Sequence, residues 1–146
     1  MTNPMPQTTQ ANESAFGVTE LVLTHEGPEQ LALLLPMIAY LSRQTSDRWI
    51  TWIAPRHINR QLLEDFGVST RCIRLIHCND ESSLWIIWEA MAKGNSHTVI
   101  ASPGRLNERE LGLLEEAARQ GECQCVLLRN RQEYLQARHS RLDVAA

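Results

Sequence analysis

The sequence lacks the segments that mark exported or membrane-spanning proteins. None of its apolar runs approaches the roughly 20 residues that a membrane-spanning helix needs. The first 16 residues, MTNPMPQTTQANESAF, have neither a basic start nor an apolar stretch, so we do not expect a signal peptide. Four cysteines in a chain without an export signal are best interpreted as reduced thiols. We therefore expect a cytoplasmic protein with no membrane partner.

Phosphate-binding motifs are also missing. The first predicted strand leads into HEGPEQ, which contains neither GxGxxG nor GxxxxGK[ST]. A P-loop needs consecutive backbone amides unobstructed by side chains, and a lysine that reaches the β- and γ-phosphates. Lys93 is the only lysine of the chain, and it ends a predicted helix. ATP or GTP binding is therefore disfavoured, although a degenerate nucleotide-binding regulator stays open as an alternative.

The cysteines and histidines do not have the spacing of a closed zinc site. His77-Cys78 and Cys123-Gln-Cys125 could supply soft ligands, but neither pair belongs to a CxxC or HxxxH pattern. In a strand, Cys123 and Cys125 share one face, and buried cysteines usually pack as small apolar residues. We therefore predict no metal ion and no other cofactor.

A catalytic arrangement has similarly little support. Ser102, His77 and Asp80 stand near predicted strand ends, which leaves a small hydrolase as a third alternative. No GxSxG elbow surrounds Ser102, whose context is ASPGR. Trp85 and Trp88 could form an aromatic platform, but packing of one ring in the core and partial exposure of the other is simpler. We predict that the protein is not an enzyme.

Helical and strand patterns alternate along the chain. This order is typical of an α/β fold, a three-layer, mostly parallel sheet flanked by helices. Residues 1–16 are expected to form a disordered arm, residues 17–129 a single domain, and residues 130–146 a flexible tail. The predicted strands are 18–24, 49–54, 71–76, 97–101 and 125–128. The predicted helices are 29–43, a short one from the Asn59 cap to Gly67, 80–93 with Asp80 as cap, and one from the Asn107–Glu110 capping box to Gly121.

The segment DRWITWIAP, residues 47–55, is the most informative stretch. As a strand it is apolar on both faces, which predicts helices on both sides and a buried Trp49. Charged residues bracket it, and five arginines stand between Asp47 and Ile76. Arginine suits planar contacts at protein interfaces, whereas the net charge of −3 gives no drive toward nucleic acid. The arginines are therefore either a solvated rim or a protein-binding surface.

Several segments together resemble the SulA family of bacterial cell-division inhibitors. They are LALLLPMIAYLSRQ, DRWITWIAP, LLEDFGVSTRCIRLI and AMAKGNSHTVI, and the similarity extends over about residues 18–129. The resemblance implies a RecA-like α/β fold without a P-loop. It also implies a protein, induced in the SOS response to DNA damage, that binds FtsZ, blocks its polymerisation and is degraded by Lon protease. A homodimer is compatible with it.

The resemblance also implies which residues contact FtsZ. Arg48 matches a family arginine needed for inhibition, while Ile53 and Leu62 replace a family leucine and tryptophan. Arg71 lies at or beside a family lysine. The set implied for FtsZ contact is Arg48, Ile53, Leu62, Arg71, Ala90, Met91, Ala92, Lys93, Gly94, Asn95 and Ser96. The tail implied for protease recognition is His139, Ser140, Arg141, Leu142, Asp143, Val144, Ala145 and Ala146, and on composition alone it could equally be an inert frayed end.

Overall fold

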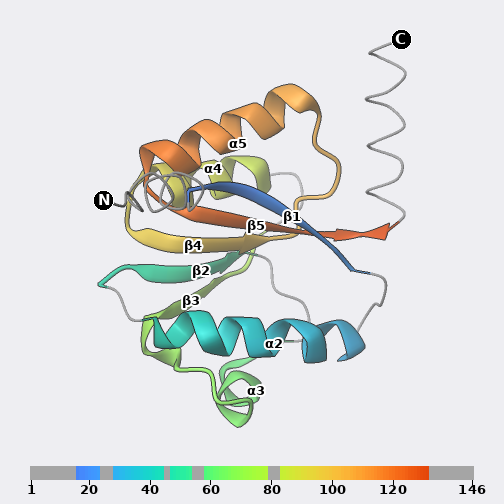
Figure 1. The fold of residues 1–146 in the computed structure, drawn as a ribbon, viewed down its shortest axis with the longest axis vertical. Helices are drawn as coiled ribbons and strands as arrows, with labels where there is room; N and C mark the ends of the chain where they lie inside the picture. The colour runs from blue at the N-terminus through green and yellow to red at the C-terminus, as the bar shows by residue number, and fades with distance from the viewer. Residues whose placement is uncertain (1–15, 24–27, 45–46, 54–57, 79–82, 132–146) are drawn as a thin grey trace, which may run out of the picture.

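The structure, a computed structural model, describes residues 16–23, 28–44, 47–53, 58–78 and 83–131. Strands and helices alternate along these residues, as the sequence pattern predicts (Figure 1). The elements are β1 (Gly17–Leu23), α2 (Pro28–Arg43), β2 (Trp49–Ile53), α3 (Arg60–Asp65), the 3-10 helix η1 (Thr70–Cys72), β3 (Ile73–Ile76), α4 (Ser83–Ala92), β4 (Ser96–Ala101), α5 (Glu108–Gln120) and β5 (Gln124–Asn130).

The described strands form one parallel sheet in the order β1-β5-β4-β2-β3. Strand β2 therefore lies between β4 and β3, with Ile50 opposite both Thr98 and Ile73. The pairing of β2 with β4 shifts at its start, because Trp49 pairs with Ser96 and Ile50 with Thr98. His97 is consequently the extra residue of a β-bulge.

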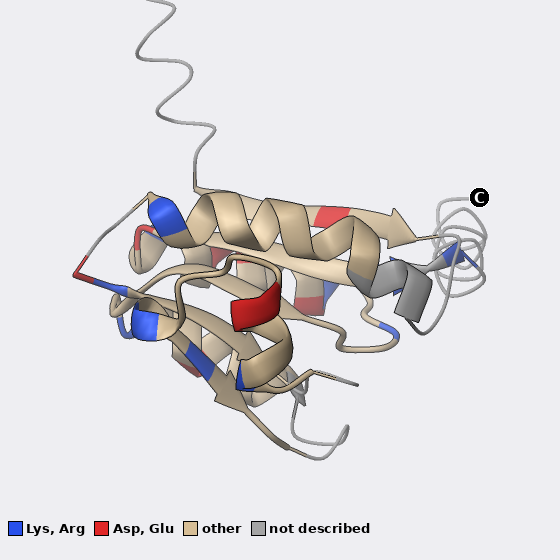
Figure 2. Cartoon of the chain, turned by 90° about the horizontal axis from the view of Figure 1, so that it is seen from below, with Lys and Arg blue, Asp and Glu red and all other residues tan. Residues whose placement is uncertain are grey.

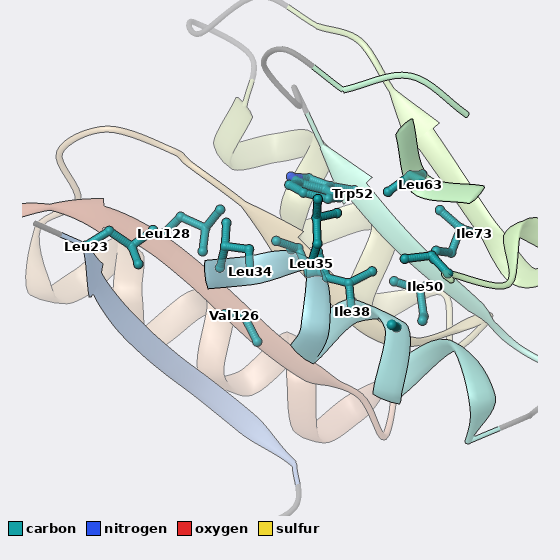
Figure 3. Packing of buried hydrophobic residues seen from close by; sticks show 13 residues of the cluster. Leu23, Leu34, Leu35, Ile38, Ile50, Trp52, Leu63, Ile73, Val126 and Leu128 are labelled. Carbon is teal, nitrogen blue, oxygen red and sulfur yellow. The ribbon is translucent and has the colours of Figure 1, made fainter. Parts of the chain in front are cut away.

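Two helical layers cover the sheet and confirm the predicted α/β architecture. Figure 1 shows α2 and α3 on one side of the sheet and α4 and α5 on the other. The first side holds a cluster built around Leu35, Ile38 and Trp52 (Figure 3). The second side holds a cluster that includes Ile53 and Met91. Because β2 contributes to both clusters, it is buried from both faces after its first residue.

Local signals in the sequence account for the starts of α3 and α5. Asn59 accepts a hydrogen bond from the amide of Leu62 at 2.8 Å, which caps α3. Asn107 and Glu110 form a reciprocal capping box at the start of α5, with distances of 2.7 and 3.1 Å. Both caps satisfy amides that have no partner within the first turn of a helix.

The third strand is shorter than predicted. It begins at Ile73, and Arg71 belongs to the preceding 3-10 turn instead of the strand. The chain approaches the sheet here from Ser69, whose amide donates to Ser42 Oγ on α2, so the approach is set by a contact distant in sequence. The Asp80 cap, residues 1–15 of the predicted arm and residues 132–146 of the predicted tail lie outside the described residues. The last strand is longer than predicted, because β5 includes Asn130, the first residue of the predicted flexible tail.

Candidate functional site: the edge where the strands begin

Parallel strands begin at a common edge of a sheet, and this edge gathers the predicted arginines. Ile50 pairs with Ile73, and Arg48 and Arg71 each stand two residues before that pair. The strands that follow these two arginines are therefore neighbours, and both side chains belong to the same edge. Figure 2 shows several basic segments toward the end of the molecule where the strands begin. We call Arg48, Trp49, Arg71, Arg74 and Asn95 the strand-start surface.

Arg48 is anchored by the turn between α5 and β5. Its Nη1 donates to the carbonyl oxygens of Glu122 at 2.8 Å and Gly121 at 3.2 Å. These carbonyls follow directly after α5, where the partial negative charge of a helix C-terminus favours a cation. The Arg48 side chain is half-buried, so its contacts stabilise the fold as well.

The prediction that Trp49 is buried is wrong. The residue is 38% exposed, unlike Ile50, Trp52 and Ile53 of the same strand. It is the first residue of β2, and its amide donates to the carbonyl of Asn95 at 2.8 Å, so it lies at the rim of the sheet. The guanidinium carbon of Arg74 lies 5.8 Å from the centre of its ring. The run of apolar residues on both faces predicted the strand correctly, but it did not show where the covering helices end.

Arg74 connects three neighbouring segments at this edge. Its Nε donates to Thr51 Oγ1 at 2.8 Å on the neighbouring strand. Its Nη2 donates to Asn95 Oδ1 at 3.1 Å and to Ser96 Oγ at 3.4 Å. Thr51 and Ser96 are fully buried and share a hydrogen bond of 2.7 Å. Arg74 is one of the five arginines between Asp47 and Ile76, and nothing in the local sequence pattern reveals that Thr51 lies opposite it.

The turn from α4 to β4 completes the edge. Gly94 has a φ of +77°, a conformation that side chains strongly disfavour, which explains why a glycine ends this helix. Asn95 next to it is exposed, and Lys93 pairs with Glu89 at 3.1 Å on the outer face of α4. The turn thus presents polar groups at the start of the sheet, beside Arg74.

His97, the bulged residue of β4, lies half-buried behind this turn. Its Nδ1 is 2.9 Å from Thr98 Oγ1. Burial, and secondarily the positive charge of Arg48, lower the pKa of His97 below its usual value of 6.5. The ring is therefore neutral at pH 7, and its protonation at lower pH opposes folding.

Several residues of the set implied for FtsZ contact lie in the interior. Ile53, Ala90, Met91 and Ser96 are each at most 6% exposed, so a partner cannot touch their side chains while the chain keeps this structure. Ile53 also ends β2, at the opposite edge of the sheet from Arg48. Leu62 and Ala92 are half-buried and pack against the two clusters. The structure thus brings together Arg48, Arg71, Gly94 and Asn95, with Lys93 on the neighbouring helix end.

The residues considered above for catalysis, metal binding or an aromatic platform do not form one site. Ser102 follows β4 and His77 follows β3, and β2 lies between those strands, so their backbones stand two strand spacings or about 10 Å apart. Cys123 and Cys125 are fully buried, and burial raises the pKa of the Cys123 thiol to about 12 and that of Cys125 further. Trp85 and Trp88 stack with ring centres 5.1 Å apart, and only Trp85 is largely exposed.

The described segments contain neither a metal-binding cluster nor a membrane-spanning helix. Among these residues, no three His, Cys, Asp or Glu side chains are grouped so that they could hold a metal ion. No helix within the same segments is long and apolar enough to cross a membrane.

The fold and this edge together define a class of protein: a parallel α/β sheet covered by helices, with arginine and tryptophan gathered where its strands begin. A family model described as cell division inhibitor SulA matches residues 17–125. The chain belongs to the SulA family of cell division inhibitors.

Individual relatives and a solved structure agree with this assignment. The cell division inhibitor SulA of Pseudomonas aeruginosa is 30% identical over 119 residues, which are 80% of this chain and 74% of that protein. The cell division inhibitor SulA of Yersinia pestis is 28% identical over 122 residues, which are 82% of this chain and 71% of the relative. The crystal structure of SulA from Pseudomonas aeruginosa matches with a TM-score of 0.72 and 30% identity, covering 77% of this chain and 97% of that one.

Proposed function

We propose that this protein halts septation by binding FtsZ in the cytoplasm and blocking its polymerisation during the SOS response to DNA damage. Membership of the SulA family is the observation that carries the proposal. The strand-start surface supplies the physical basis, because Arg48 is held by two backbone carbonyls and Arg74 by three side chains. Preorganised arginines lose little conformational entropy when they bind a carboxylate.

The proposed inhibition is stoichiometric and non-catalytic. A protein that acts by occupying a surface of FtsZ lowers the concentration of subunits available for assembly, so one inhibitor can hold only about one subunit. In a sedimentation assay with GTP, we expect polymer to disappear as the inhibitor approaches the FtsZ concentration. Complete inhibition at a hundredth of that concentration would contradict this mechanism.

Arg48→Ala is the most direct test of the surface. We expect affinity for FtsZ to fall by about 30-fold or more, the range of an interface hot spot. Because Arg48 also binds Gly121 and Glu122, we expect the free energy of unfolding to fall by about 1–2 kcal/mol. Binding should therefore be measured at a temperature where circular dichroism shows the variant folded. Arg109→Ala, at an exposed position on α5, is the control and should bind like the parent; equal affinity for Arg48→Ala would remove Arg48 from the interface.

A titration with ATP or GTP, without FtsZ, tests the alternative that the protein is a degenerate nucleotide-binding regulator. If the fold kept a nucleotide site, Mg²⁺ with ATP or GTP at 100 times its dissociation constant would stabilise the protein by about 2.7 kcal/mol. We expect no change in melting temperature with either nucleotide.

We further propose that Lon protease removes the inhibitor and that its recognition uses residues 139–146. A protease needs an accessible end from which to begin unfolding its substrate. Deletion of His139–Ala146 should lengthen the half-life in cells and leave FtsZ inhibition unchanged. An unchanged half-life would show that the tail is not the recognition element.

A further inference from the structure

Trp49 presents an aromatic ring on a rigid part of the strand-start surface. The residue is 38% exposed, although large aromatic side chains normally gain by burial. Its backbone is held by the parallel pairing of β2 with β4 and by the hydrogen bond to Asn95. The ring therefore adds contact area without the entropy cost of ordering a flexible side chain.

Arg74 restrains this ring and keeps hydrogen-bonding capacity of its own. Three hydrogen bonds, from Nε and Nη2, fix its guanidinium against Thr51, Asn95 and Ser96, 5.8 Å from the centre of the Trp49 ring. Within the described part of the chain, Nη1 of Arg74 makes no hydrogen bond, and it is not among the buried atoms without a partner. Nη1 is therefore not completely buried, and its two N–H groups can donate to an acceptor from outside.

We propose that Trp49 and Arg74 together form the centre of the contact with FtsZ. The matching surface on FtsZ would offer an apolar side chain that covers the indole ring and a carboxylate that accepts from Nη1 of Arg74. This inference rests on the proposed function and adds two residues that the family resemblance did not assign. Tryptophan and arginine are the residue types most enriched among interface hot spots, and they act most strongly where neighbouring contacts exclude water.

The two residues have different roles in this contact. Trp49 supplies apolar area, so its effect should depend on ring size and little on salt. Arg74 supplies a charge and also positions the ring, so part of its effect should pass through Trp49. Arg74→Lys keeps a cation near the ring but cannot reproduce the planar fork that reaches Thr51 and Asn95 together.

The experiment measures the dissociation constant of the complex with GDP-bound FtsZ by calorimetry, with the melting temperature of each variant measured alongside. We expect Trp49→Ala and Arg74→Ala each to weaken binding at least 20-fold, and Trp49→Phe and Arg74→Lys at least threefold. Trp85→Ala is the matched control, because Trp85 is 66% exposed near the start of α4, whereas Asn95 follows the end of that helix. Its affinity should stay within twofold of the parent.

A double variant tests the positioning role. If Arg74 acts partly through the ring, Arg74→Ala should cost less affinity in a Trp49→Ala background than in the parent, whereas independent contacts would multiply their effects. Should either alanine variant fail to fold, Trp49→Phe and Arg74→Lys decide the matter, because the first keeps an aromatic ring and the second keeps the positive charge. Parental affinity in those two variants would overturn the inference while leaving the proposed function intact. A parent protein that does not bind FtsZ would instead overturn the proposed function and the inference with it.

Discussion

Among the glycines that the structure describes, Gly121 is the one at which an added methyl group should do most damage to the fold. Its backbone has an ordinary φ of −88°, so the need for glycine is steric and not conformational. A Cβ built there would lie 1.7 Å from the carbonyl oxygen of Met91 and 2.8 Å from its carbonyl carbon. Since ordinary contacts begin near 3.4 Å, the ends of α4 and α5 would have to separate by about 1.7 Å.

The cost of that separation follows from what the two helix ends hold together. Met91, Ala117 and Ala118 are at most 1% exposed, and Arg48 binds the carbonyls of this turn. We expect Gly121→Ala to lower the free energy of unfolding by at least about 3 kcal/mol, the upper part of the range for overpacking. For a domain of this size, that corresponds to a loss of roughly 10 °C in melting temperature.

Gly112→Ala, inside the helix that Gly121 follows, provides the matched control. A Cβ at Gly112 meets nothing within 4 Å, and the residue is exposed within α5. Because glycine is unfavourable inside a helix, this variant should gain about 0.5–1 kcal/mol. Thermal and urea unfolding followed by circular dichroism measure both changes. A Gly121→Ala protein as stable as the parent would refute the reasoning, as would similar losses in both variants.

Three further predictions follow from local contacts. Burial and Arg48 lower the pKa of His97 from 6.5, so the contribution of its neutral ring to stability is complete above about pH 6.5 and is lost as the pH falls toward the folded-state pKa. The free energy of unfolding should therefore fall less between pH 7.5 and pH 5.5 in His97→Gln than in the parent. Asn107→Ala should lower the free energy of unfolding by about 1 kcal/mol, because it removes the α5 cap, and Asn107→Ser should restore most of that loss. If thermal unfolding showed Asn107→Ala to be as stable as the parent, the cap would not contribute to stability. Iodoacetamide at pH 8 should label the half-buried Cys72 and Cys78 roughly tenfold faster than Cys123, because Cys123 is buried and burial raises its pKa to about 12. Peptide mass spectrometry measures the labelling rates, and comparable rates would contradict the burial of Cys123.

The sequence by itself determined the features that depend on neighbouring residues. Asn59 and the Asn107–Glu110 pair mark two helix starts because their hydrogen bonds span three residues. The order of strands and helices, the α/β class and the burial of β2 after its first residue follow from periodicity in short windows. The arginines before β2 and β3 could be placed at one edge because parallel strands begin together.

Only the tertiary structure decided which contacts the residues make at the edge where the strands begin. The strand order β1-β5-β4-β2-β3 sets Arg74 against Thr51, 23 residues away, and Arg48 against Glu122, 74 residues away. Neither contact leaves a periodic trace in the sequence, because each depends on which strands are neighbours and on where α4 and α5 end. The exposure of Trp49 and the steric demand on Gly121 arise in the same way. Short-range patterns predict the elements, and long-range packing decides which of their residues remain exposed to a partner.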